Sequence, residues 1–141
     1  MIRFYSETDF NLNNKQTYKN WLKSIIEKNS NRVGEINYIF CDDPYLLEIN
    51  QKYLNHDFYT DIITFDYSEG KKIHGDIYIS IDRVRENATL YNQTFDKELL
   101  RVLSHGVLHL CGFDDQNQED KIQMTNQEDE AIILYDSFIK S

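Results

Sequence analysis

The residues best suited to chemistry are His105 and His109, which stand four positions apart in the segment Ser104–Asp115. The apolar pattern around them predicts a helix over 95–111, so both imidazoles project from one helix face, one turn apart. Two nitrogens held on adjacent turns suit a tetrahedral zinc ion. The spacing therefore indicates a metal site, although histidine pairs of this kind also occur at surfaces and in cores.

A third ligand is expected just beyond this helix. Gly112 occupies the position of a C-terminal helix glycine, which enters the left-handed conformation without penalty. The chain can then turn back toward the histidines, and Asp115, six residues after His109, is predicted to supply the third ligand. Asp114 is the alternative. The glycine and the carboxylate together favour a metal site over a surface pair.

Gly106 directly follows the first histidine, at the position where zinc peptidases of the His-Glu-x-x-His type carry their general base. A hydrolase of peptides or small esters is therefore disfavoured. Glycine inside a helix costs about 1 kcal/mol relative to alanine, so we interpret Gly106 as a point of close packing. No general base is apparent beside the ligands, and the catalytic group is taken to be a water activated by the metal.

One basic residue lies on the same helix face as the two histidines. Arg101, one turn before the first of them, is predicted to contact a substrate phosphate. The alternative is an ion pair with Glu98, or a contact that supports a ligand. His56 and His74 fall outside the pattern and are interpreted as surface or loop residues.

The elements that position these residues form an α+β pattern. The sequence predicts a single domain over 1–141, with a four-stranded mixed sheet packed with several helices and the metal site on a helix and the turn after it. Asp43 is the expected N-cap before Pro44, and Thr94 is the expected cap of the histidine helix. Strands are predicted at 2–6, 35–41, 61–67 and 73–81, the last two as a hairpin, and helices at 15–28, 44–54, 82–91, 95–111 and 118–138.

Composition limits the classes of function. The chain has 141 residues and a net charge of −9, with acidic residues concentrated in 112–141. Binding to nucleic acid relies on clustered Lys and Arg, so any such role must use a local patch. Two cysteines are too few for a disulfide framework. The start resembles no signal peptide and no apolar run approaches ~18 residues, so we expect a cytoplasmic protein without membrane contact.

These motifs together resemble the YbeY family of metal-dependent endoribonucleases. The family signature His-Gly-x-Leu-His-Leu-x-Gly-Tyr/Phe-Asp-His is matched over 105–114. Residues 50–65 and 75–80 resemble the family's Asn-x-x-Tyr-Arg-x-x-Asp-x-Pro-Thr-Asp-Val-Leu-Ser-Phe segment and its Gly-Asp-Ile strand. The resemblance implies one zinc ion and a single-strand endoribonuclease. Its expected roles are 3′-end maturation of small-subunit ribosomal RNA and ribosome quality control.

The sequence departs from the family pattern at three positions. Asp115 replaces the third histidine, and a site of two histidines and one carboxylate also suits iron or manganese. Leu54 stands where the family has an arginine thought to act on RNA, and Tyr59 replaces a proline. Asp61 and Asp76 match family positions without an assigned catalytic role. The alternative function is a non-catalytic ribosome-assembly or adaptor protein with a structural metal.

Overall fold

Four strands and five helices lie within residues 1–139, which are the residues that the computed structural model describes. The end of the predicted 1–141 domain, 140–141, lies outside them. The element order matches the predicted α+β pattern. The elements are β1 (Ile2–Ser6), α1 (Lys15–Lys28), β2 (Arg32–Cys41), α2 (Asp43–Leu54), β3 (Ile62–Asp66), β4 (Lys72–Ser80), α3 (Ile81–Leu90), α4 (Phe95–Leu110) and α5 (Gln118–Ile139).

The strands form one mixed sheet in the order β1-β2-β4-β3, as predicted. β1, β2 and β4 are parallel, while β3 pairs antiparallel with β4 and confirms the hairpin. β2 begins earlier than predicted, because Arg32 and Val33 already pair with the start of β4. The second hairpin strand ends earlier than predicted, because the Ser80 hydroxyl accepts from the backbone N–H of Arg83 and opens α3.

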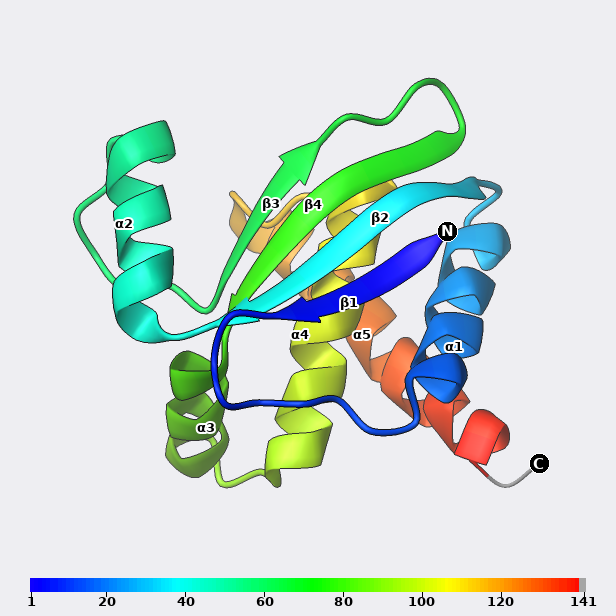
Figure 1. Ribbon diagram of the computed structural model, residues 1–141. Helices are drawn as coiled ribbons and strands as arrows, with labels where there is room; N and C mark the ends of the chain where they lie inside the picture. Colours follow the sequence, from blue (N-terminus) through cyan, green and yellow to red (C-terminus); the bar gives the residue numbers. More distant parts are fainter. Residues whose placement is uncertain (140–141) are drawn as a thin grey trace.

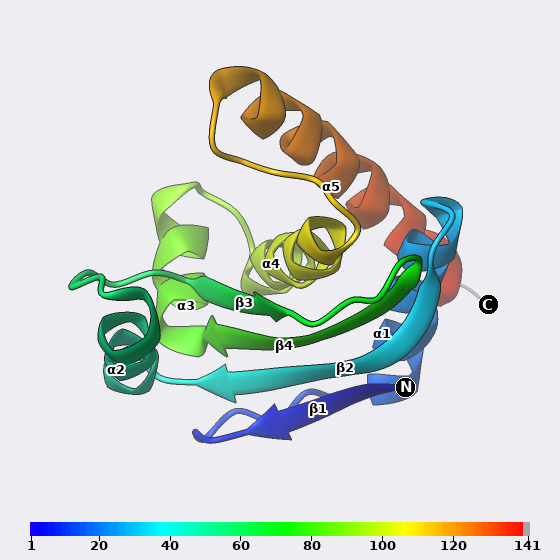
Figure 2. The same ribbon diagram turned by 90° about the horizontal axis from the view of Figure 1, so that it is seen from above.

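One face of the sheet is covered by helices and holds the main core. Alternate strand residues such as Ile36, Tyr38 and Ile77 are fully buried there, together with apolar residues of α1 and α4. Figures 1 and 2 show α4 and α1 behind the sheet and α5 lying across α4 on the outer side. α2 covers one end of the opposite face, where its Leu46 belongs to a small buried cluster with Ile63 of β3. Within residues 1–139, no helix is long and apolar enough to cross a membrane.

The ends of the helices follow local sequence with one correction. Asp42, rather than Asp43, caps α2, because its carboxylate accepts from the backbone N–H of Tyr45 at 3.0 Å. Thr94 caps α4 as predicted, accepting from the backbone N–H of Lys97 at 3.1 Å. Gly112 has a φ of 106°, so the predicted left-handed turn after the histidine helix is confirmed.

Glycines on both sides permit close contact between α4 and β4. A Cβ built at Gly106 would lie 3.0 Å from Ile77 Cδ1, which confirms close packing at that position. On the strand side, a Cβ at Gly75 would lie 2.9 Å from Leu110 Cδ2. The helix that carries both histidines is therefore seated directly on β4.

Candidate metal-dependent active site

All four residues singled out from the sequence line one cavity of about 420 Å³: Arg101, His105, His109 and Asp115. α4 supplies the first three residues and the loop after Gly112 supplies the fourth. The cavity walls also include the residues just before β3 and one residue of α5. The structure thus brings together side chains from segments far apart in the chain.

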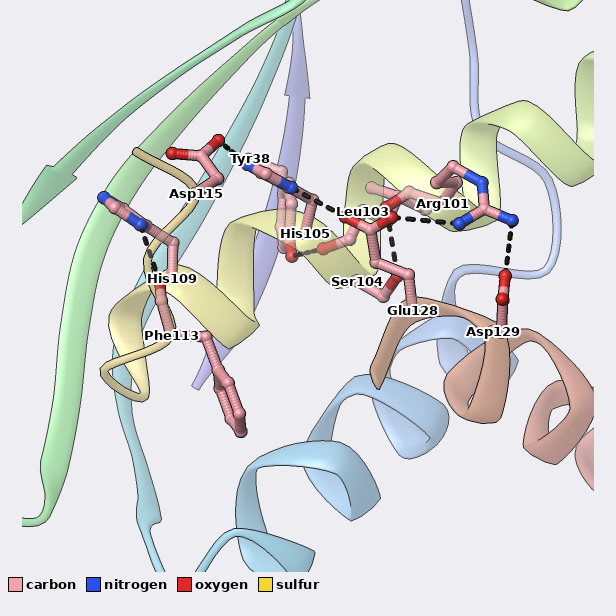
Figure 3. Close-up of polar contacts among 10 residues, drawn as sticks. All are labelled: Tyr38, Arg101, Leu103, Ser104, His105, His109, Phe113, Asp115, Glu128 and Asp129. Carbon is pink, nitrogen blue, oxygen red and sulfur yellow. Dashed lines mark hydrogen bonds and ion pairs between the residues drawn. The ribbon is translucent and has the colours of Figure 1, made fainter. Parts of the chain in front are cut away.

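His105 is held between two carboxylates. Its Nδ1 lies 2.7 Å from Glu128 Oε2, and its Nε2 lies 3.4 Å from Asp115 Oδ2 (Figure 3). Burial by itself would lower the pKa of His105, but the hydrogen bond and charge of Glu128 outweigh burial and raise that pKa. A carboxylate on Nδ1 fixes the ring and makes the opposite nitrogen a more basic ligand. His105 therefore presents Nε2 to the cavity.

His109 is oriented in the same manner by the backbone. Its Nδ1 lies 3.1 Å from the carbonyl oxygen of Phe113, to which it can donate in the Nδ1–H tautomer. The two imidazoles are nearly parallel, with an interplanar angle of 8° and centroids 6.4 Å apart. In Figure 3 the carboxylate of Asp115 lies between the two rings. The tight turn at Gly112 thus serves both to orient His109 and to return Asp115.

The donor set fits a zinc-type ion in kind. Two ligands of a tetrahedral zinc ion at ~2.0–2.1 Å stand roughly 3.3 Å apart, close to the 3.4 Å between His105 Nε2 and Asp115 Oδ2. Among residues 1–139, however, no three His, Cys, Asp or Glu side chains are gathered closely enough to hold an ion together. His105 and Asp115 are thus spaced as two ligands of one ion would be, and the third donor, His109, lies one helical turn away.

Arg101 is held by α5 and not by its own helix. Its two terminal nitrogens lie 3.0 Å from Glu128 Oε1 and 2.7 Å from Asp129 Oδ1. Within residues 1–139, Arg101 forms its ion pairs with Glu128 and Asp129 and none with Glu98. The alternative prediction of a pair with Glu98 is therefore wrong. Because Glu128 also contacts His105, Arg101 supports a predicted ligand through a shared carboxylate. Its side chain remains 30% exposed at the cavity wall.

The cavity is acidic. Burial is the main cause that raises the pKa of Asp61, and burial followed by the charge of Asp61 raises the pKa of Glu98. Both line the cavity together with Asp115 and Glu128. Such a lining favours a cation, since a bound ion would relieve the repulsion among the carboxylates.

Glu128 was missed by reasoning from the sequence. Its side chain is 8% exposed, and both of its oxygens are used, one by Arg101 and one by His105. A signal did exist: Glu128 falls between Met124 and Ala131 on the buried stripe of α5, where an acid needs a partner. The many acidic residues around it hid this signal.

The remaining candidates lie elsewhere. Asp114 is exposed, whereas Asp115 lines the cavity. His56 is exposed in a loop, as expected, but His74 belongs to β4, where its Nδ1 accepts from the backbone N–H of Glu35 at 2.9 Å. Asp76 accepts from the Asn37 side chain at 3.0 Å and does not line the cavity.

The comparisons with known proteins agree with one another. A family model described as "Endoribonuclease YbeY" matches residues 3–135. A protein of that name from Flavobacterium psychrophilum is 56% identical, covering 96% of each chain. Its namesake from Karelsulcia muelleri is 44% identical over 99% of this chain and 96% of its own. The solution structure of a Thermotoga maritima protein matches with a TM-score of 0.66 and 32% identity, covering 94% of this chain and 87% of its own.

Proposed function

The chain belongs to the YbeY family of endoribonucleases, and on that premise we propose that it cleaves single-stranded RNA with the aid of one bound zinc ion. The proposed role is 3′-end maturation of small-subunit ribosomal RNA and ribosome quality control in the cytoplasm. The support for this role is family membership, while the support for the metal is the chemistry of the cavity.

His105, His109 and Asp115 would hold the ion. Two neutral imidazole nitrogens and one carboxylate form a donor set that zinc accepts and that iron or manganese also accepts. A bound ion of this kind supplies Lewis-acid activation of water and charge neutralisation at a phosphoryl oxygen. The single observation that carries the proposal is the placement of Asp115 opposite Nε2 of His105, with Glu128 behind Nδ1.

The other residues act by binding and orientation. Glu128 holds His105 in one tautomer, and the Phe113 carbonyl does the same for His109. Arg101, fixed by Glu128 and Asp129, presents a preorganised guanidinium at the cavity wall for a substrate phosphate. Positioning of this type lowers the barrier because the groups need not reorganise during the reaction.

Metal content is the first test. Elemental analysis of protein purified without added metal should find about one equivalent of a transition metal, and His105→Ala and Asp115→Ala should each lose it. His74→Ala is the matched control, because His74 lies on β4 away from the cavity, and it should retain the metal. Cleavage of a single-stranded ribosomal RNA fragment by the same preparations should follow metal content.

Two results would contradict the proposal. Wild-type protein that takes up no metal even from added zinc would remove the metal site. Loaded wild-type protein that leaves single-stranded RNA intact, under conditions where a curated family member cleaves it, would remove the proposed activity.

A further inference from the structure

A second hollow of about 220 Å³ adjoins the active-site cavity. The two share a wall made by Thr60, Ile62 and Thr64. The far side of the second hollow is formed by the end of α2 and the loop that follows it, including Leu54 and Phe58. An extended strand with one phosphate in the first cavity would therefore place its neighbouring nucleotide at the second.

The loop over the second hollow presents aromatic rings to the surface. Phe58 and Tyr59 are each 56% exposed. The ring of His56 stacks on Phe58, with centroids 5.1 Å apart and an interplanar angle of 23°, and the guanidinium of Arg83 lies 5.5 Å from the centre of the Tyr59 ring. One partner thus supports each ring, while more than half of each residue stays open.

The position of this loop is fixed by a buried polar contact. Asn50, 1% exposed, donates from Nδ2 to the carbonyl oxygen of Phe58 at 2.9 Å. The backbone N–H of His56 donates to the carbonyl oxygen of Asn50 at 3.1 Å and closes α2. The aromatic rings are therefore presented by an anchored turn, so little ordering is needed to bind a flat ring.

Charge makes stacking the main available source of RNA affinity here. Arg101 is the one Lys or Arg that lines the active-site cavity, within residues 1–139, and two carboxylates already pair with it. Leu54, the last residue of α2, stands where the resemblance to the family implies an arginine. The whole chain has a net charge of −9, so contact with phosphates gains little from counterion release. Stacking of bases on aromatic side chains does not depend on that charge.

We propose that the hollow lined by Leu54, His56 and Phe58 is a base subsite, which stacks an unpaired nucleobase next to the phosphate in the active-site cavity. The inference rests on the proposed RNA substrate. It makes Phe58 a specificity-determining residue: the strand must be single and must carry a base at this position, because a paired base cannot leave its stack to enter the hollow.

Binding of a fluorescent single-stranded RNA, measured by anisotropy with the full-length protein, tests the subsite without requiring cleavage. A set of otherwise identical RNAs carries one abasic nucleotide each, at successive positions. Wild-type protein should bind the natural strand about 10-fold more tightly than the strand lacking the stacked base. Phe58→Ala should remove that difference. Tyr67→Ala is the matched control, because Tyr67 is 58% exposed but follows the far end of β3.

A second variant tests the same idea in the opposite direction. Leu54→Arg should bind RNA more tightly at low salt, with a salt dependence steeper by about one unit of slope, and should depend less on the flanking base. Equal binding of natural and abasic strands by wild-type protein would overturn the subsite. So would an equal loss of RNA affinity in Phe58→Ala and Tyr67→Ala. A base preference in protein that never cleaves RNA would instead leave the subsite standing and remove the proposed activity.

Discussion

At the scale of single residues, Glu128 connects the two halves of the site. One oxygen orients His105 and the other pairs with Arg101, so the predicted ligand and the predicted phosphate contact share a carboxylate. Only 8% of this side chain is exposed, which makes each of its contacts stronger than a surface pair. The geometry of the donor set therefore depends on a residue that would not itself touch the ion.

Glu128→Gln should weaken metal binding without unfolding the protein. The amide keeps the shape of the side chain but removes the charge behind His105, and loss of such a partner costs roughly 10- to 100-fold in metal affinity. Competition with a zinc chelator measures this change. Asp129→Asn is the control, because Asp129 contacts Arg101 alone of these residues and should leave zinc affinity within about 2-fold. Equal effects in the two variants would contradict the role of Glu128.

Sequence reasoning placed the residues of α4 and its turn because their spacing is local. Two histidines four apart on a helix, followed by a glycine, define directions in space without knowledge of the fold. Glu128 could not be placed in this way, since its partners lie 23 and 27 residues earlier on another helix. The same limit explains why the alternative considered for Arg101 was an ion pair with Glu98, its neighbour in sequence, and not with Glu128.

At the scale of elements, the packing of α4 against the sheet determines how far both histidines lie from β4. A methyl group added at Gly106 would lie 3.0 Å from Cδ1 of Ile77 in β4, which is a tight contact. Ile77 is fully buried, so it cannot swing aside into solvent. A methyl group at Gly106 would therefore require Ile77 or α4 to shift by a few tenths of an ångström.

Gly106→Ala should lower the free energy of unfolding by at most about 2 kcal/mol. Overpacking costs roughly 1–3 kcal/mol, and the better helix propensity of alanine returns about 1 kcal/mol. Ile77→Val removes Cδ1, the atom nearest to the added methyl group, so the double variant should be more stable than the sum of the single changes predicts. Urea unfolding of the four proteins measures the coupling, and strict additivity would show that the contact is not strained.

Patterning predicted these elements better than their arrangement. The hairpin and the caps follow from short segments, and they differ from the prediction by at most one residue, as at the Asp42 cap. The order β1-β2-β4-β3 depends on long-range pairing that no local pattern encodes, although a mixed sheet was expected. The loop 55–61 gave no periodic signal, and its aromatic residues gained meaning only from the hollow beside them.

At the scale of the whole molecule, α5 joins the site to the opposite side of the core. Trp21 of α1 is fully buried and donates from Nε1 to the carbonyl oxygen of Ala131 at 2.8 Å. Tyr135 packs its ring against Trp21 and Tyr18. Because Glu128 lies one turn before Ala131, the docking of α5 on α1 determines where that carboxylate meets His105.

Trp21→Phe should lower the free energy of unfolding by about 1–3 kcal/mol, since it removes a buried hydrogen bond and part of the ring volume. We expect amide hydrogen exchange to accelerate more along α5 than in β4, because the lost contact is made to α5. Exchange that rises uniformly in both elements would mean that α5 does not open separately from the rest of the fold.

The location of Glu128 on the final helix also bears on how the protein is made. β2 obtains its second neighbour only when β4 has been synthesised, and His105 obtains its carboxylate only when α5 has followed. Folding during translation proceeds from the N-terminus, so the contact that orients His105 forms only after almost the whole chain has been synthesised. A nuclease whose cavity is completed in this order acquires its last cavity residue only when its own synthesis is nearly finished.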